Sequence, residues 1–270
     1  MFIISKLLKS INKNFKTRIK LNIAQVLNKL NFLDSVLKQS LGIGYVASLE
    51  TEVKYLVGSH LENFTIFDIG ANNGNYSLTV AKLFPKSIIY SFEPSKTSFD
   101  HLVENVKSES SITPVQIGFG EEKRKTILYS DKAGSGMASI YHRQFENSEI
   151  EFHRIETINI EKLDDWVHQN RITPDFVKID VEGAELSVLR GGINVLKNVK
   201  AIQFEFGGTA IDAKNYFRDY WQFFTGLNFI LYRYTPSGLL RIAKYSEKEE
   251  VFEFMNYLAV SIKNHSLAAR

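Results

Sequence analysis

Acidic side chains stand at the ends of several apolar runs in this sequence. The runs TIFDIGA, SIIYSFEP, PDFVKIDVEG and KAIQFEFGG carry Asp68, Glu93, Asp180, Glu182 and Glu205. A carboxylate can take a proton as a general base, hold the hydroxyls of a sugar or bind a cation. If the runs are parallel strands of one sheet, their carboxyl ends form the edge where open α/β folds bind ligands. The pattern therefore predicts one ligand site that is built from acids.

A glycine loop follows the first of these runs, in the stretch FDIGANNGNYS at 67–77. It resembles a dinucleotide-binding turn, in which the second glycine lets backbone contact a pyrophosphate and the third allows close packing. Asn72 and Asn75 stand where the second and third glycines of that turn would be. Gly70 and Gly74 are present and can let backbone approach a ligand. The loop is expected to hold a ligand without a pyrophosphate, or to be a tight strand-to-helix turn with no ligand.

Glu93 lies 19 residues after Gly74, at the tip of the second apolar run. An acid at this spacing can bind both hydroxyls of a ribose, which indicates a ligand that contains a nucleoside. Asp68, just before the turn, is a poor neighbour for phosphate and suits a cationic or zwitterionic ligand. S-adenosylmethionine has a ribose, an amino acid end and a sulfonium, and it lacks phosphate. The alternative for Glu93 is a solvated acid before Pro94.

Lys178, Asp180 and Glu182 alternate along the run PDFVKIDVEG. In a strand these three positions point to the same face, so we expect the side chains to interact near its end. Asp180 emerges from an apolar run, which tends to raise the pKa of a carboxylate unless a cation such as Lys178 offsets it. Asp180 and Glu182 are predicted to act in catalysis or in orienting the substrate; the alternative is that one of them caps the next helix.

Three further residues are weighed for a role in the site. Glu205 is a third catalytic candidate, and with Asp180 it could hold Mg²⁺ through oxygen ligands. Two carboxylates are too few to assign a metal, so no metal ligand is predicted. His142 and His153 lie in a loop, where a histidine can be a general base or simply a solvated side chain; we add His142 to the catalytic candidates.

Strand-like runs alternate with helical patterns from about Tyr45 onward. The expected strands include 65–71, 87–94, 113–120, 125–131, 174–183 and 200–208, and the expected helices are NYSLTVAKLF, KTSFDHLVENVK, AELSVLRGGINVLK and NYFRDYWQFFTGL. This alternation predicts an α/β fold with a doubly wound, mostly parallel sheet and helices on both faces. The final segments NFILYRYTPSGLLRIAKY and MNYLAVSI alternate like an antiparallel hairpin, which would lie at one edge of that sheet.

Two segments could shape the acceptor side of the site. Residues 131–155 lack a clear period and are expected to form a loop over the active face, which could seal the site from water. The aromatic residues of the last helix are expected to lie mostly in the core, although exposed members could stack on a sugar: Tyr216, Phe217, Tyr220, Trp221 and Phe224.

Composition narrows the class of protein. The 270 residues are 44% hydrophobic and 23% charged, which is typical of a soluble globular chain. No cysteine is present, so disulfides, thiolate catalysis and cysteine-bound zinc are excluded. Residues 1–40 carry a net charge of +7 and the remainder −4. The mildly acidic body does not predict a nucleic-acid partner.

The basic N-terminal segment has apolar residues at helical spacing. Lysines interrupt every apolar run, so it is expected to be neither a transmembrane span nor a signal peptide. It is expected either to pack on its own domain or to contact an anionic membrane surface peripherally. The predicted organisation is a helical extension at 1–44 and a ligand-binding domain at 45–270, in a cytoplasmic protein that could lie at the inner face of a membrane.

Four motifs together resemble the FkbM family of S-adenosylmethionine-dependent methyltransferases: FDIGANNGNYS, YSFEPS, FVKIDVEGAELSVLRGG and IQFEFGG, within about 65–208. The resemblance implies a class I methyltransferase fold with a seven-stranded sheet and methyl transfer, usually to a hydroxyl oxygen. It carries the cofactor role over to the matching positions Asp68, Gly70, Asn72, Gly74 and Glu93. We also assign to the cofactor site Tyr76, Gln116 and Asp180.

The leading functional prediction is an O-methyltransferase that uses S-adenosylmethionine and acts on a sugar, glycan or related metabolite. One alternative is an oxidoreductase of the NAD type, against which Asp68 and the missing glycine count. Another is a non-catalytic nucleotide-binding module of the same fold. The sequence leaves open the acceptor, the oligomeric state and any dependence on Mg²⁺.

Overall fold

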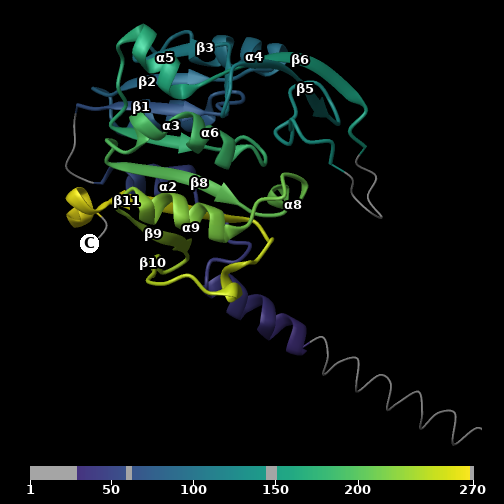
Figure 1. The fold of residues 1–270 in the computed structure, drawn as a ribbon, viewed down its shortest axis with the longest axis vertical. Coiled ribbons are helices and arrows are strands. Elements are labelled where there is room, and N and C mark those ends of the chain that lie inside the picture. Colours follow the sequence, from purple (N-terminus) through teal and green to yellow (C-terminus); the bar gives the residue numbers. More distant parts are fainter. Residues whose placement is uncertain (1–28, 59–62, 144–150, 268–270) are drawn as a thin grey trace, which may run out of the picture.

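The computed structural model describes residues 29–58, 63–143 and 151–267, which form two sheets with helices packed around the larger one (Figure 1). The strands are β1 (Thr65–Ile69), β2 (Ile88–Phe92), β3 (Ile112–Val115), β4 (Gly118–Phe119), β5 (Arg124–Ser130), β6 (Arg154–Glu161), β7 (Phe176–Ile179), β8 (Ala201–Phe206), β9 (Phe229–Thr235), β10 (Gly238–Ile242) and β11 (Met255–Ser261). The α-helices are α2 (Leu49–Val57), α3 (Asn75–Leu83), α4 (Lys96–Val106), α5 (Leu163–Asn170), α6 (Glu185–Gly191), α7 (Ile193–Leu196), α8 (Thr209–Asp212) and α9 (Phe217–Gly226). The 3₁₀ helices are η1 (Glu247–Glu249) and η2 (Ile262–Leu267).

The larger sheet has the strand order β10-β9-β11-β8-β7-β1-β2-β3. Its pairs β1–β2, β2–β3, β1–β7 and β7–β8 are parallel, whereas β11 pairs antiparallel with both β8 and β9. The chain runs outward from β1 to β3 and then returns to β7 on the other side of β1. The order therefore reverses between β1 and β7, and ligands bind beyond the carboxyl ends of strands at such a point.

The prediction of a doubly wound, mostly parallel α/β sheet is confirmed, but the sheet has eight strands and not seven. The additional strand is β10, which forms a hairpin with β9 across the two-residue connection 236–237. Strand β11 lies between β9 and β8. The predicted two-stranded hairpin is therefore observed as three antiparallel strands, β10, β9 and β11, at the edge of the sheet. The single run NFILYRYTPSGLLRIAKY contains two strands because Pro236 and Ser237 form its turn.

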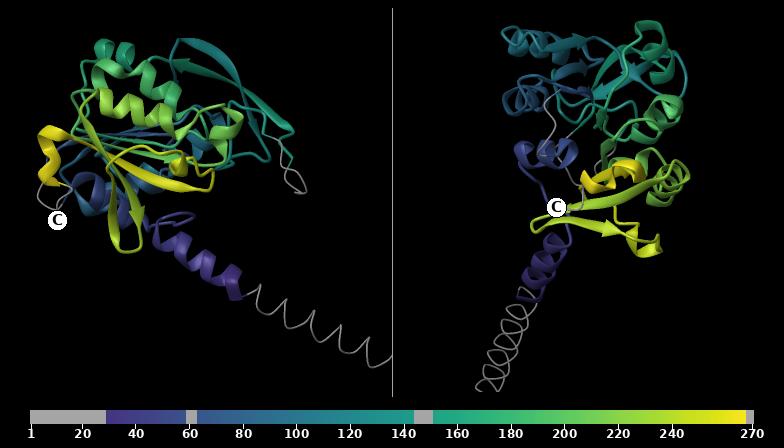
Figure 2. Two further views of the ribbon diagram at one scale, coloured as in Figure 1. Left: turned by 60° about the horizontal axis from the view of Figure 1, so that its bottom comes forward. Right: turned by 90° about the vertical axis from the view of Figure 1, so that its left-hand side faces the viewer.

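Two layers of helices cover the two faces of the large sheet (Figure 2). Alternate residues of β1 show the division, since Ile66 packs in one cluster and Phe67 and Ile69 pack in the other. Helices α2, α3 and α4 pack with the first cluster, and α5, α6 and α9 pack with the second. Because strands covered on both faces must be apolar on both, buried polar residues in this sheet need a specific partner.

A small second sheet with the order β4-β6-β5 stands beside the carboxyl end of the large one. Extended chain is observed at β3, β4 and β5, as predicted, and the predicted loop 131–155 is observed in 131–143 and 151–153, but its last two residues belong to β6. The sequence analysis did not predict β6, α5, α8 or α2. In strand β6 two polar residues, Glu156 and Thr157, separate Ile155 from Ile158, so the alternation is incomplete and easily missed.

Residues 29–40 form a helix that projects from the body (Figures 1 and 2). The turn that follows it is fixed to the body, because Gly44 N–H donates to the Phe254 carbonyl at 2.9 Å and Arg233 donates to the Leu41 carbonyl at 3.3 Å. The boundary between an extension at 1–44 and a domain at 45–270 stays a prediction, and 1–28 lies outside the described residues. Within the described ranges, the helices are too short or too polar to cross a bilayer.

Gly70 permits the close approach of β1 and β7 on which the ligand-binding edge depends. Its φ is +81°, a conformation that favours glycine, and a Cβ placed on it would lie 1.7 Å from the Asp180 carbonyl oxygen. The Asp180 N–H donates to the Ile69 carbonyl at 3.0 Å, so the two strand ends are bonded at this same point. No side chain fits at position 70 without separating the strands.

We expect Gly70→Ala to lower the free energy of unfolding by about 2–4 kcal/mol, since it adds a backbone clash and strain. Gly226→Ala is the matched control, because a Cβ on Gly226 meets no atom within 4 Å and alanine favours a helix. Urea denaturation gives the free energy of unfolding of both variants, provided that the m-value is unchanged. Equal midpoints for the two variants would contradict the close approach.

Candidate active site

A cavity of about 410 Å³ opens at the carboxyl ends of the parallel strands. It extends from the β1–α3 loop and the end of β2 to the ends of β7 and β8, and the small sheet supplies an apolar wall that includes Phe119 and Ile158. Its volume is in the range of small-molecule sites. Gly70, Asn72, Tyr76 and Glu93 line one part, as the sequence analysis predicted for a cofactor site.

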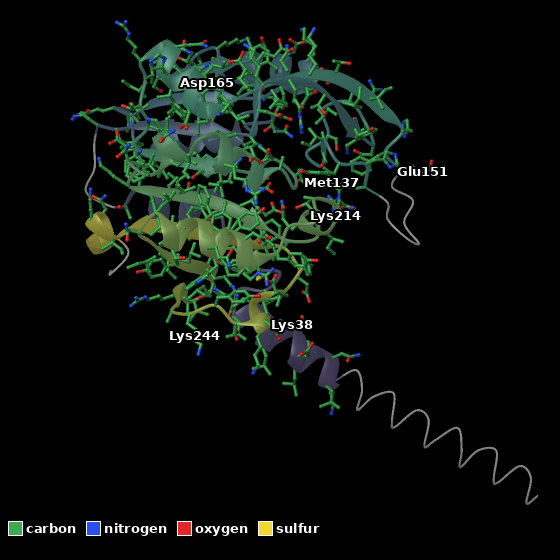
Figure 3. The ribbon with its side chains drawn as sticks, in the orientation of Figure 1. Lys38, Met137, Glu151, Asp165, Lys214 and Lys244 are labelled. Carbon is green, nitrogen blue, oxygen red and sulfur yellow. The ribbon has the colours of Figure 1, made fainter. Side chains whose placement is uncertain are left out.

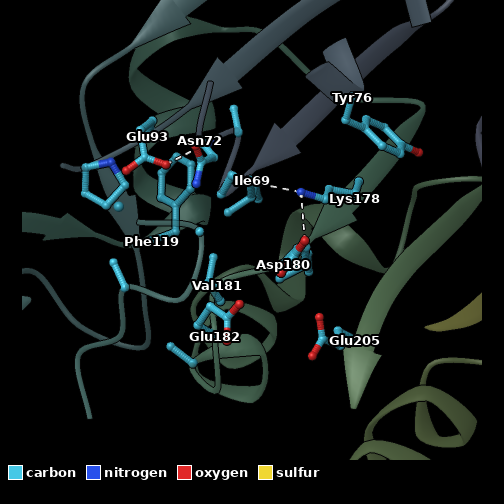
Figure 4. A pocket seen from close by; sticks show the side chains of 18 of the residues that line it. Ile69, Asn72, Tyr76, Glu93, Phe119, Lys178, Asp180, Val181, Glu182 and Glu205 are labelled. Atoms are coloured by element: carbon cyan, nitrogen blue, oxygen red, sulfur yellow. Dashed lines mark hydrogen bonds and ion pairs between the residues drawn. The ribbon is translucent and has the colours of Figure 1, made fainter. Parts of the chain in front are cut away.

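Glu93 holds the β1–α3 loop in place. Its carboxylate accepts the Asn72 N–H at 2.9 Å through one oxygen and the Ser95 N–H at 2.9 Å through the other (Figure 4). Asn72 has φ +47°, the left-handed conformation that the sequence analysis allowed for an asparagine here. Burial raises the pKa of Glu93 to about 7, although both N–H donors oppose this effect.

Lys178 is the buried cation at the junction of β1 and β7. Its Nζ lies 3.3 Å from Asp68 Oδ1 and 3.4 Å from Asp180 Oδ2, and it donates to the Gly70 carbonyl at 3.1 Å. Burial lowers the pKa of Lys178, but the two carboxylates outweigh burial and leave that pKa above its usual value. The predicted pairing of Lys178 with Asp180 is confirmed.

Asp68 lies behind the cavity wall. Its side chain is fully buried, and besides the pairing with Lys178 it accepts a hydrogen bond from Ser77 Oγ at 2.7 Å. Asp68 is not among the residues that line the cavity, so the structure does not support direct contact between this carboxylate and a ligand. Its carboxylate is paired with Lys178 and acts on the cavity through its charge, which helps to raise the pKa of Glu93.

Carboxyl groups gather at the other end of the cavity, where Asp180, Glu182 and Glu205 lie around one opening (Figure 4). Burial, with repulsion from Asp180 and Glu185, raises the pKa of Glu182 to about 8, against the nearby Arg143. Burial and the same acids also raise the pKa of Glu205 well above its usual value. These two groups therefore hold a proton readily near neutral pH.

The prediction that Lys178, Asp180 and Glu182 share a strand face is wrong for Glu182. Strand β7 ends at Ile179, and Glu182 has φ +53°, so the chain has already turned at that position. The capping role considered for Asp180 or Glu182 is not observed, because α6 begins after Ala184 without a side-chain cap, and Glu185 holds the turn before the helix. Its carboxylate accepts the Val181 and Gly183 N–H groups at 3.0 and 3.1 Å, and burial raises the pKa of Glu185 to about 7.

The segment after β5 crosses the mouth of the cavity and is attached on both sides. The Asn72 side chain donates to the Ser135 carbonyl at 3.4 Å, and Ser139 Oγ donates to the Glu182 carbonyl at 2.7 Å. Arg143 then pairs with Glu182 at 3.4 Å and with Asp212 at 3.3 Å. The described part of the predicted lid thus lies over the acidic end of the site.

A buried polar network forms the side of the cavity that the sequence analysis missed. Tyr76 Oη donates to Gln203 Oε1 at 3.0 Å, Gln203 Nε2 donates to Glu52 at 2.7 Å, and Asn256 Nδ2 donates to Glu52 at 2.8 Å. Gln203 shares the alternation of β8 with Glu205, so a polar residue two positions before the predicted acid was the available signal. Glu52 and Asn256 come from distant elements and gave no local signal.

Several predicted residues lie outside the cavity lining. Gly74 approaches α4, because a Cβ on it would lie 2.7 Å from Leu102 Cδ1, and its role is in packing. Gln116 is exposed on the chain beyond β3. His142 is exposed and packs its ring edge-on against Tyr129, so a catalytic role for it is not carried forward.

The aromatic helix is a core element, as expected for most of its members. Phe217, Tyr220 and Phe224 are buried, and neither they nor Tyr216 and Trp221 line the cavity. A sugar-stacking wall on α9 is therefore not supported. Among the described residues, no group of three or more acidic or histidine side chains is placed to hold a metal ion.

Comparison with known families matches residues 68–231 to the Methyltransferase FkbM domain, which is more than half of the chain. The hexuronic acid methyltransferase AglP of Haloferax volcanii is 28% identical over 156 residues, covering 57% of this chain and 60% of that protein. The 2-O-methyltransferase NoeI of Sinorhizobium fredii is 26% identical over 152 residues, covering 52% and 62%. The chain thus spans less than two thirds of the length of these curated relatives.

Among solved structures, the methyltransferase FkbM from Methylobacillus flagellatus aligns with a TM-score of 0.48 at 16% identity. The alignment covers 76% of this chain and 47% of that one.

A double-mutant cycle tests the buried ion pair. We expect Lys178→Met to lower the free energy of unfolding by about 3–5 kcal/mol, because it leaves Asp68 charged and buried without its cation. Asp68→Asn combined with Lys178→Met should cost about 1–3 kcal/mol less than the sum of the single changes. Chemical denaturation of the four proteins measures this coupling, and additive costs would show that the two charges do not depend on each other.

The pH dependence of stability tests the burial of Glu185. An unfolded glutamate ionises near about pH 4.3. The folded-state pKa of Glu185 is raised to about 7. The unfolded chain therefore loses this proton first, and the free energy of unfolding falls as pH rises through that window. Glu185→Gln keeps an oxygen for the two N–H groups, so it should remove roughly 1–3 kcal/mol of this fall.

Chemical denaturation at about pH 5 and about pH 7 gives the fall in the free energy of unfolding for wild type and for Glu185→Gln. Glu104→Gln, on the exposed face of α4, is the control and should follow the wild-type curve. If the Glu185→Gln curve also runs parallel to wild type, Glu185 is not protonated in the folded protein near neutral pH.

Proposed function

Because the chain belongs to the FkbM methyltransferase family, we propose that it transfers a methyl group from S-adenosylmethionine to a hydroxyl oxygen of a sugar, glycan or related metabolite. The family and the doubly wound sheet support methyl transfer. The identity of the methyl donor, transfer to an oxygen atom and the class of acceptor are proposals.

The observation that carries the proposal is the charge of the cavity. Its lining contains five carboxyl groups and two cationic side chains: Glu52, Glu93, Asp180, Glu182 and Glu205, with Lys178 and Arg124. A cation is favoured in this lining because it lowers the pKa values of the protonated acids and pairs with the carboxylates that form, whereas a pyrophosphate would be repelled by every acid that ionises. Since the sulfonium of S-adenosylmethionine carries a positive charge and the molecule has no phosphate, this donor matches the lining in both respects.

The β1–α3 loop also favours a donor without phosphate. The Asn72 N–H, at the position where a dinucleotide-binding turn presents backbone to a pyrophosphate, already donates to Glu93 at 2.9 Å. Glu93 keeps further lone pairs that can accept the hydroxyls of a ribose. The residues present therefore fit a nucleoside with an amino acid end better than they fit NAD.

When bound, S-adenosylmethionine supplies a methyl group on a good leaving group, so the chain has to align the acceptor and remove its proton. Glu182 and Glu205 are the proposed bases: both hold a proton near neutral pH, and a positive charge placed beside them would lower their pKa values toward the working pH, where a base works best. Burial raises the pKa of Glu182 to about 8. Asp180 is held by Lys178 and is proposed to orient the acceptor hydroxyl.

The proposed acceptor class comes from the relatives and from the cavity. AglP is named for a hexuronic acid and NoeI for transfer to a 2-O position, and both match this chain over more than half of its length. Polar groups on one side of the cavity and the apolar wall of the small sheet on the other suit a molecule with hydroxyls and a carbon ring. The segment 131–143 would exclude water from this end.

Calorimetric titration tests the donor, with NAD as the comparison ligand. We expect S-adenosylmethionine to bind with one-to-one stoichiometry and NAD not to bind. Glu93→Gln should weaken binding about tenfold or more, because a charged acceptor of hydrogen bonds is lost. Glu104→Gln on exposed α4 is the control and should bind as wild type. Binding of NAD in place of the methyl donor would favour the oxidoreductase.

A transfer assay separates an enzyme from a binding module. Purified protein with S-adenosylmethionine and a panel of monosaccharides and glycans should give products heavier by CH2, because a methyl group replaces the hydroxyl hydrogen, and mass spectrometry detects this gain. Glu205→Gln should lower kcat about 10²-fold or more, whereas donor binding should weaken much less, because Asp180 and Glu182 still face the donor. Donor binding without turnover on any hydroxyl acceptor would favour the module.

A further inference from the structure

The projecting helix 29–40 has two distinct sides. With about 100° between successive residues of a helix, five apolar side chains share one side: Leu30, Phe32, Leu33, Val36 and Leu37. The polar side chains Asn31, Asp34, Ser35, Lys38 and Gln39 occupy the other side, while the terminal residues Lys29 and Ser40 fall at the two ends of the apolar side. The helix is therefore amphipathic over three turns.

The apolar side of this helix faces solvent. Phe32 is 68% exposed and Leu37 is 64% exposed, and the other three members are close to half exposed or more. The polar side carries the contact with the body, since Lys38 pairs with Glu253 at 3.1 Å where the helix meets the body (Figure 3). A surface helix of a globular protein normally turns its apolar side to the core, so this arrangement points to an apolar partner outside the body.

The charge around the helix identifies the partner. Residues 1–40 carry a net charge of +7, and their one acidic residue, Asp34, is on the polar side and paired with Lys38 at 3.4 Å. We propose that helix 29–40, together with the basic residues that precede it, docks this protein on an anionic membrane surface through its apolar side. Apolar side chains enter the boundary of the bilayer while lysines contact the headgroups.

The same charges disfavour a second copy of this chain as the occupant. Two copies packed through this side would bring two segments of +7 together, and like charges oppose that association. The remainder of the chain carries −4 and is itself repelled by an anionic surface. A helix that projects from the body keeps the acidic body away from the headgroups while the basic segment contacts them (Figure 2).

Co-sedimentation with vesicles tests this docking surface on the full chain. We expect binding to vesicles of phosphatidylcholine with phosphatidylglycerol, weak binding to phosphatidylcholine alone, and loss of binding at high salt. Leu33→Glu with Leu37→Glu should reduce the partition coefficient about tenfold or more, since it removes the apolar contact. The matched control is Asn31→Glu with Ser35→Glu, which adds the same charge at the same spacing on the polar side and should retain most of the binding.

Circular dichroism melting and light scattering complete the test. Because the substituted side chains are exposed, both double variants should melt as wild type does, and wild type should be monomeric. Equal loss of binding in both variants, or no binding of wild type to anionic vesicles, would overturn the proposal. A wild-type dimer that only the Leu33→Glu and Leu37→Glu variant dissociates would assign the apolar side to a second copy.

Discussion

One buried ammonium group connects the parts of this site. Lys178 on β7 is paired with Asp68 on β1, pairs with Asp180 beyond the end of its own strand and donates to the carbonyl of Gly70. Lys178 and Asp68 would each be costly to bury alone, and together they satisfy one another, while Asp180 adds a partly exposed carboxylate. Because Gly70 allows the two strand ends to approach, the cation can reach both carboxylates at the point where the strand order reverses. The position of the β1–α3 loop and of Asp180 depends on this arrangement.

The acids around Lys178 then decide what the cavity can hold. One ammonium cannot balance Asp68, Asp180, Glu182 and Glu205, so burial and mutual repulsion raise the pKa values of Glu182 and Glu205. A positive charge placed among them would be stabilised and would lower those pKa values. Under the proposed function, this would link a cationic methyl donor to groups that can accept a proton. The family assignment supports methyl transfer, and the electrostatic argument supports the proposed cationic donor.

Local patterns in the sequence predicted much of this structure. Buried runs of four to six residues predicted the parallel strands. The spacing from Gly74 singled out Glu93, which lines the cavity, while its predicted contact with a ribose stays a prediction and its bond to Asn72 was not foreseen. What could not be predicted depends on contacts between distant segments. Asp68 looked like a ligand contact, but tertiary packing turns it to Lys178 and Ser77 behind the wall. Glu52 and Asn256 enter the cavity from α2 and β11, and β10 was hidden within a run that read as one strand.

The central claim is that the carboxyl cluster receives a positive charge, and proton linkage measures this directly. Calorimetric titrations of S-adenosylmethionine and S-adenosylhomocysteine at about pH 7, in two buffers of different ionisation enthalpy, give the number of protons released by each ligand. The two ligands differ in the methyl group and in the charge on sulfur. The account predicts that S-adenosylmethionine releases more protons, because its sulfonium lowers the pKa values of Glu182 and Glu205. Equal proton release by both ligands would contradict it, because the sulfonium would then lie away from these acids.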